Sequence, residues 1–233
     1  MFVLVLPALL IVGAGFWFAA RYIKPAPPDF TTFSCGAEGS AYETYCARYK
    51  PLIEPFGVRV DVRQSAGSIE NLQRLMDTEQ SVDFAFVQGG SAEDHPPGLL
   101  SLGAAYYEPV WVFYRGRPGL DRLDQLKGLR IGVGAEGSGT RHLALQLLEA
   151  HALVGDAKLL KPLGGTAGVV ALLSRKIDAL IVVGAVNSAS VWSLLYADGI
   201  SLMSMAQSPA YARRFPHLSE VTLPRGAIDF VRD

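Results

Sequence analysis

The sequence has 233 residues, of which 50% are hydrophobic and 18% charged, so it can form one large domain or two lobes and is too apolar to be disordered. Its 21 Lys and Arg nearly balance 22 Asp and Glu, for a formal net charge of −1. There is no basic run long enough to follow a phosphate backbone, so we expect no nucleic-acid partner.

An uncharged stretch of 19 residues, Phe2 to Ala20, opens the chain. As a helix it would span about 28 Å, close to the roughly 30 Å of a bilayer core, and we predict a membrane anchor over residues 1–23. A cleaved signal peptide is the alternative. It is disfavoured because the stretch is longer than a usual signal core, no basic segment precedes it, and Phe18-Ala19-Ala20 is a poor cleavage site.

The charges around the anchor conflict with an extracytoplasmic location. Arg21 and Lys24 follow the apolar stretch and nothing basic precedes it, so the positive-inside rule would leave the remainder in the cytoplasm. The conflict would disappear if Met1 were an internal residue of a longer chain with a basic stretch upstream. The next residues, KPAPPD at 24–29, predict an extended proline-rich linker.

Two cysteines, Cys35 and Cys46, follow the linker. Their spacing fits no metal signature and no disulfide framework. A bridge would require the next helix to turn Cys46 back toward Cys35, so we expect two small buried thiols instead.

The pentapeptide GAEGS occurs twice, at Gly36–Ser40 and at Gly134–Ser138, 98 positions apart. Each copy follows a short strand pattern and precedes a helix pattern. A second small-residue turn follows at the same distance in both halves, since Gly36 to Gly67 and Gly134 to Gly165 both span 31 residues. A further helix and strand end each half. We therefore predict two copies of a β-α-β-α-β unit.

Such units form parallel sheets, and ligands bind at the carboxyl ends of the strands, where the repeated turns lie. We expect a Ser or Thr to cap each helix and the unpaired amides of the four helix starts to converge on an anion. These starts contain Gly39, Ser40, Gly67, Ser68, Gly137, Ser138, Gly139, Thr140, Gly165 and Thr166.

The chain crosses between the halves at an aromatic segment, AAYYEPVWVFYRGRPG. Its aromatic residues either line the cleft or fill the hinge core, and for each of them the core is the better expectation; they are Tyr106, Tyr107, Trp111 and Tyr114. We predict lobe 1 over residues 30–106, lobe 2 with the hinge strand over 107–205, and a segment returning toward lobe 1 over 206–233.

Several stretches together resemble one family. They are GSAYETY, SAGSIENLQRLMDTEQSVDFAFVQ, LGAAYYEPVWVFYR, LDQLKGLRIGVGAEGSGTRHLALQLL, PLGGTAGVVALL and SPAYARRFPHLSEVTLPRG. In order and spacing they are similar to the TAXI subfamily of solute receptors of tripartite ATP-independent periplasmic (TRAP) transporters. The resemblance implies a two-lobe type II periplasmic-binding-protein fold that closes by a hinge on a small carboxylate-bearing solute. It also implies delivery to a membrane permease, with the receptor anchored on the periplasmic side of the bacterial inner membrane.

The resemblance also implies ligand-binding roles. Ser40 and Tyr42 match the first ligand loop, Ser68 the second and Gln88 the end of the strand facing the cleft; Ser138, Thr140 and Arg141 match the GSGT loop. Guanidinium pairs bidentately with carboxylate, so Arg141 is our candidate clamp, against the alternative of a solvated first-turn arginine.

Two features depart from the family. Glu38 and Glu136 stand in the ligand loops, where they would repel a dicarboxylate unless they point outward or hold the ammonium group of an amino acid such as glutamate. Family members also continue beyond LPRGAIDFVRD, so this sequence is compatible with a chain lacking its last elements.

Two other functions are compatible with such a fold. An enzyme would need a catalytic constellation, but we find no catalytic motif, and the four histidines (His95, His142, His151, His217) form no ligand-like group. Ser138 and His142 are spaced as a nucleophile and base could be, although a cap and an exposed ring are the more frequent outcome. We expect no catalysis, metal or cofactor. A membrane-tethered sensor for the same solute stays open.

Overall fold

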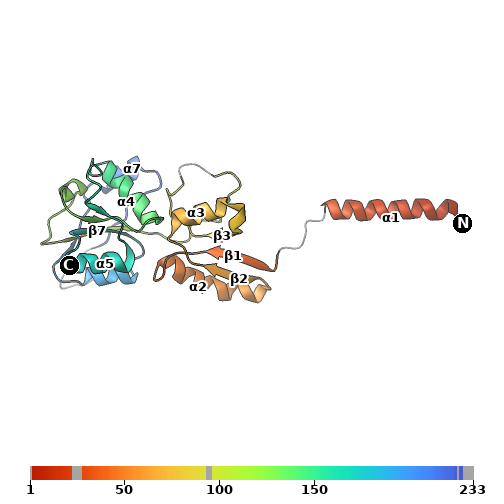
Figure 1. Cartoon of the computed structure of the whole chain (residues 1–233), viewed down its shortest axis with the longest axis horizontal. Coiled ribbons are helices and arrows are strands. Elements are labelled where there is room, and N and C mark those ends of the chain that lie inside the picture. The colour runs from red at the N-terminus through yellow and green to blue at the C-terminus, as the bar shows by residue number, and fades with distance from the viewer. Residues whose placement is uncertain (1, 23–27, 93–95, 225, 228–233) are drawn as a thin grey trace.

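The structure is a computed structural model that describes residues 2–22, 28–92, 96–224 and 226–227, so most of the predicted linker, His95 and the last six residues lie outside the described part. Helix α1 (Phe2–Tyr22) stands apart from two lobes (Figure 1). Within the described residues it is the one helix apolar and long enough to cross a membrane, with a mean hydropathy of 1.6 over Val5–Tyr22. A signal sequence would meet the same criteria.

Lobe 1 is the predicted β-α-β-α-β unit. Its parallel three-stranded sheet has the order β2-β1-β3. The elements are β1 (Phe30–Ser34), α2 (Ala41–Ile53), η1 (Glu54–Phe56), β2 (Arg59–Arg63), α3 (Ser68–Met76), η2 (Thr78–Gln80) and β3 (Phe84–Ala85).

Lobe 2 repeats this unit and extends it. Strands β6-β5-β7 are parallel and have the same spatial order as β2-β1-β3. Strand β4 lies antiparallel beside β7, and β8 lies antiparallel beside β4 at the sheet edge. The elements are β4 (Val110–Arg115), η3 (Leu123–Leu126), β5 (Ile131–Gly132), α4 (Gly139–Glu149), β6 (Leu160–Lys161), α5 (Gly165–Leu173), β7 (Ala179–Val183), α6 (Ala189–Leu195), β8 (Ile200–Leu202) and α7 (Ser208–Arg214).

The repeat extends to the hydrogen bonds at the strand starts. In lobe 1, Asp83 accepts from the backbone amide of Thr32 (2.8 Å) and its own amide donates to the Thr32 carbonyl (3.0 Å). In lobe 2, Asp178 accepts from the Arg130 amide (2.9 Å) and donates to the Arg130 carbonyl (2.8 Å). Each aspartate therefore ties the start of the last strand of the unit to the first strand.

Strand β4 forms the centre of the lobe 2 core. Val112 and Tyr114 pack in one apolar cluster and Trp111 and Phe113 in another, so both faces of the strand are covered. This explains why its sequence is continuously apolar rather than alternating. Trp111 and Tyr114 thus fill the core, as expected, whereas Tyr107 is 79% exposed.

The returning segment first packs on lobe 2. Tyr211 of α7 is buried in the lobe 2 core, and Phe215 and Leu218 pack against the same cluster. His217 then reaches lobe 1, where its ring lies against Gly90. The domain boundaries given above stay predictions.

The expectation of two free thiols is wrong, because Cys35 and Cys46 form a disulfide. Cys35 follows β1 and Cys46 lies in α2, and their Cα atoms are 6.2 Å apart, within the range that a disulfide spans. The turn between them folds α2 back over β1. Both residues are fully buried in the small lobe 1 core with Phe33 and Val60, so their burial was predicted correctly.

We predict that the disulfide stabilises lobe 1. Because it closes a loop over a separation of 11 residues, its removal should lower the free energy of unfolding by about 3 kcal/mol. Urea unfolding of the oxidised chain with and without reductant measures this, and a Cys35→Ser/Cys46→Ser double variant, which should not respond to reductant, is the control. Equal midpoints for oxidised and reduced chains would contradict the prediction.

Candidate functional site

The two GAEGS turns have the same conformation. Gly39 and Gly137 adopt φ of 74° and 75°, a left-handed conformation that glycine tolerates best. The next residue caps the following helix in both copies: the hydroxyl of Ser40 accepts from the Glu43 amide, and that of Ser138 from the Arg141 amide, both at 3.2 Å. The repeated letters therefore encode one helix-starting turn used twice.

The other two helix starts differ from the prediction. The N-cap of α3 is Gly67 and that of α5 is Gly164, and neither forms a side-chain capping bond. Ser68 and Thr166 lie inside their helices and do not cap them. The hydroxyl of Ser68 instead accepts from the amide of Gln88 at 2.8 Å, which ties α3 to the loop after β3.

The lobes meet where α3 and α4 begin. The carbonyl oxygen of Gly137 in lobe 2 accepts from the amides of Ile69 (3.2 Å) and Glu70 (3.4 Å) in lobe 1. A Cβ on Gly67 would lie 3.3 Å from the Cα of Ser138, so the two backbones are nearly in contact. In this arrangement the first amides of α3 bind a carbonyl of lobe 2, not an anion.

A second part of the contact involves Gly139, the first residue of α4. A Cβ there would lie 2.7 Å from Oε1 of Gln88 and 2.8 Å from the hydroxyl of Ser68. The hydroxyl of Tyr42 lies 3.2 Å from that of Ser68. Predicted residues of both lobes thus come together here: Tyr42, Gly67, Ser68, Gln88, Gly137, Ser138 and Gly139.

Other predicted residues lie outside this contact. Gly165 and Thr166 are exposed at the start of α5, and a Cβ on Gly165 would meet no atom of the described residues within 4 Å. Gly39 is exposed on the GAEGS turn of lobe 1, and its amide donates to Glu43. Glu38 and Glu136 are both exposed, consistent with the outward orientation. The predicted convergence of four helix starts is therefore seen for α3 and α4.

The start of α4 offers unused donors. Nη1 of Arg141 is buried and has no hydrogen-bond partner among the described residues. No described residue accepts a hydrogen bond from the amides of Gly139 or Thr140 either. A buried guanidinium nitrogen without an acceptor is costly, and each of these groups is of a kind that donates to carboxylates.

A half-buried carboxylate that sequence reasoning missed lies beside this contact. Glu108, at the crossing into lobe 2, accepts from the hydroxyls of Tyr42 (2.9 Å) and Tyr106 (3.2 Å). Burial raises the pKa of Glu108 above its ordinary value, although the two phenols act in the opposite direction. Burial also raises the pKa of Tyr42, which keeps this phenol protonated as a donor. The one sequence signal for Glu108 was its position directly before Pro109, where the chain crosses between the lobes.

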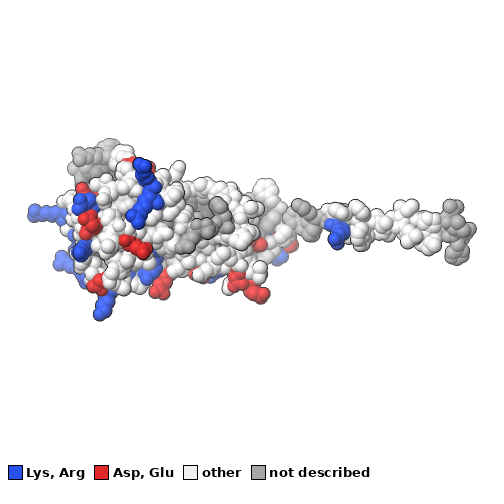
Figure 2. Space-filling model, turned by 90° about the horizontal axis from the view of Figure 1, so that it is seen from above, with Lys and Arg blue, Asp and Glu red and all other residues white. Residues whose placement is uncertain are grey.

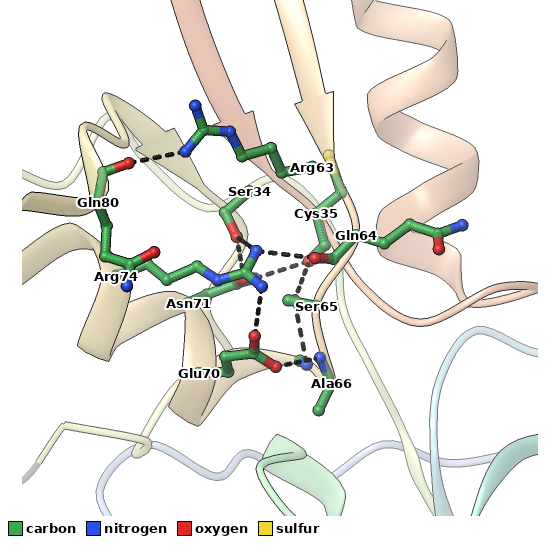
Figure 3. Close-up of polar contacts among 11 residues, drawn as sticks. Ser34, Cys35, Arg63, Gln64, Ser65, Ala66, Glu70, Asn71, Arg74 and Gln80 are labelled. Atoms are coloured by element: carbon green, nitrogen blue, oxygen red, sulfur yellow. Dashed lines mark hydrogen bonds and ion pairs between the residues drawn. The ribbon is translucent and has the colours of Figure 1, made fainter.

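The turn that meets Gly137 is held by a polar network that the sequence did not reveal (Figure 3). Nη1 of Arg74 donates to the Gln64 carbonyl (2.7 Å) and the Ser34 hydroxyl (3.1 Å), and its Nη2 pairs with Glu70. Glu70 accepts from the Ala66 amide at 2.6 Å. This network holds the turn before α3 in place.

The enzymatic alternative receives no geometric support at Ser138. Its hydroxyl donates to the Ala135 carbonyl (2.6 Å), while Nε2 of His142 lies 3.1 Å from the Gly90 carbonyl oxygen of lobe 1. His142 is half-buried, not exposed as expected, because it belongs to the lobe contact. Burial and nearby His142 lower the pKa of His217, which packs against the same glycine.

Charges of both signs are interspersed on the face of the lobes seen in Figure 2, with no large area of one sign. In the same view α1 is mostly uncharged.

Two lobes that repeat one unit, with helix starts meeting between them, form the type II periplasmic-binding-protein fold, a fold that binds small solutes. The chain matches the NMT1-like family over residues 33–233 and belongs to that family. The predicted fold class is therefore confirmed.

Solved structures share this fold. An ancestral arginine-binding protein bound to arginine has a TM-score of 0.52 and 10% identity, over 76% of this chain and 79% of its own. The CcmR regulatory domain of Synechocystis PCC6803 in complex with 2-PG has a TM-score of 0.50 and 17% identity, over 76% and 81%. Tv2483 bound to L-arginine has a TM-score of 0.50 and 14% identity, over 75% and 72%.

We predict that Gly139→Ala holds the lobes apart, because the new Cβ would overlap Gln88 and the buried hydroxyl of Ser68. Spin labels on cysteines introduced at Gln73 and Glu149, one in each lobe, should report a longer or broader distance distribution in double electron–electron resonance. Gly155→Ala, which has open space around its Cβ, is the control. Identical distributions for Gly139→Ala and Gly155→Ala would contradict the prediction.

We also predict that Glu108→Gln changes how stability depends on pH. A carboxyl whose pKa is raised by folding stabilises the folded protein most when the pH is below the carboxyl's ordinary pKa of 4.5. This stabilisation is lost as the pH rises through the pKa of the folded state. The melting temperature of Glu108→Gln relative to the wild type should therefore rise from about pH 4 to about pH 8. Thermal unfolding checks this against the exposed control Glu149→Gln, and a flat difference would refute it.

Proposed function

We propose that the chain is the solute receptor of a TRAP-type secondary transporter of the TAXI subfamily. In this proposal the lobes close on a small carboxylate-bearing solute at the start of α4 and deliver it to membrane permease subunits. The residue pattern across the lobes and the type II fold support the proposal, and the family to which the chain belongs is compatible with it.

The unpaired Arg141 nitrogen carries the proposal. Arg141 lies two residues after Gly139, which contacts lobe 1, in the helix turn whose Gly139 and Thr140 amides have no acceptor among the described residues. A carboxylate bound there would accept from the guanidinium and these amides together, and the positive end of the helix would favour it. A cation at a helix start is electrostatically unfavourable by itself, and the bound anion would offset this cost for Arg141.

Lobe opening is part of the proposal. The lobes touch directly at Gly137 and Gly139, so a solute can enter only when α3 and α4 separate. The contact consists of backbone hydrogen bonds, close-packed glycines and polar side chains such as His142 and Gln88, which makes separation inexpensive compared with an apolar interface. Hinge motion about the crossing at Glu108 and Pro109 would provide this opening.

The proposed location is extracytoplasmic, with α1 as anchor. The buried Cys35–Cys46 disulfide supports it, because disulfides persist in oxidising compartments such as the bacterial periplasm. This weighs against the orientation suggested by Arg21 and Lys24. A gene for a fused permease beside this one would support uptake over the sensor alternative, and a signalling gene would favour the sensor.

The solute is proposed to be a dicarboxylate or an amino acid such as glutamate. Calorimetry with glutamate, glutarate and 2-oxoglutarate tests this, and Arg141→Ala should weaken the binding of every ligand by about 100-fold, since a buried charged pair is lost. Arg141→Lys should recover part of it. Exposed Arg213→Ala should bind like the wild type. Unchanged affinities in Arg141→Ala would refute the clamp.

A further inference from the structure

Exposed apolar side chains gather at the end of lobe 1 nearest the linker. Phe56 is 85% exposed, Leu52 64% and Phe30 43%. Phe30 begins β1 directly after the linker, Leu52 lies in the last turn of α2, and Phe56 ends η1. We call these three residues, with Arg59, the linker-end patch.

The members of this patch are neighbours in the fold. Arg59 pairs with Phe30 in the β1–β2 register, and its guanidinium carbon lies 5.9 Å from the centre of the Phe30 ring. Phe56 precedes Arg59 by three residues, joined to it through a left-handed turn at Gly57. Figure 1 shows the end of α2 and the starts of β1 and β2 together, at the end of lobe 1 away from lobe 2.

The length of the linker limits how far this patch can be from α1. Seven residues, 23–29, separate Tyr22 from Phe30. Even fully extended, this segment spans at most about 30 Å. If α1 crosses the membrane, as the proposed function requires, the start of β1 lies close to the bilayer surface.

We propose that the linker-end patch rests in the lipid interface of the membrane that holds α1. Phe56 and Leu52 would enter the boundary of the acyl chains, and Arg59 would lie among the headgroup phosphates, as aromatic and basic residues do at membrane surfaces. This inference rests on the anchoring role of α1 in the proposed function.

The charges near the patch favour an apolar contact over an electrostatic one. Arg59 pairs with Asp29 at 3.8 Å, and Lys50 pairs with Glu54 at 3.7 Å, so the basic groups are largely balanced. The contact therefore needs no anionic lipid. It would hold lobe 1 against the membrane with the lobe contact at its far end, so that lobe 2 is the lobe that moves.

The test uses the full chain in phosphatidylcholine vesicles. Both native cysteines are in the disulfide, so a third one can be spin-labelled specifically. We label Phe56→Cys and Leu52→Cys separately, so that each variant keeps the other apolar residue. The control is Val170→Cys on α5, 57% exposed. Relaxation by lipid-soluble oxygen relative to a water-soluble nickel chelate reports the depth of each label.

The patch labels should show an oxygen-to-nickel ratio about threefold or more above that of the Val170→Cys label. Equal ratios at all three positions would overturn the proposal. Spin–spin broadening at Phe56→Cys that disappears on dilution with unlabelled chain would overturn it too, because a second copy of the chain would then cover the patch. Carbonate extraction of the same vesicles separates the causes of failure. If the chain stays in the membrane but its labels are exposed to water, only the proposed lipid contact of the patch is refuted. If carbonate extracts the chain, both the anchoring by α1 and the lipid contact are refuted.

Discussion

At the centre of the lobe contact, the carbonyl oxygen of Gly137 accepts from two amides in the first turn of α3, those of Ile69 and Glu70, across the lobe boundary. These bonds require two helix starts to approach at backbone distance, and glycines at positions 67, 137 and 139 make room for that approach. Because backbone and polar side chains make this contact rather than interlocked apolar ones, the same surfaces can separate and rejoin. The lobes can therefore close on a solute without disrupting a packed core.

The groups around this contact have different tasks. Arg74 and Glu70 hold the lobe 1 turn in place, while Gly139 allows Ser68 and Gln88 to reach α4. Arg141 is half-buried, and its buried Nη1 has no partner among the described residues. A fixed turn on one side and an unsatisfied cation on the other are what a closing carboxylate site needs.

The sequence predicted the duplicated unit and missed most of the long-range contacts. The repeated pentapeptide was sufficient to predict two like turns, because left-handed Gly39 and Gly137 and the caps Ser40 and Ser138 act locally. The disulfide, the Tyr42–Glu108 bond and the Arg74 network join residues from different elements, and these depend on how the elements pack. The prediction that Ser68 caps α3 was wrong for the same reason, since its hydroxyl accepts from the amide of Gln88, 20 positions away.

Hydrogen exchange tests the central claim most directly, because it follows both sides of the lobe contact in one experiment. Peptides covering residues 66–72 of lobe 1 and 137–142 of lobe 2 are compared with and without saturating glutamate, glutarate or 2-oxoglutarate. We predict that at least one of these solutes slows exchange in both peptides together. Protection confined to one lobe, or no protection with any of the three, would contradict closure of the lobes on a carboxylate.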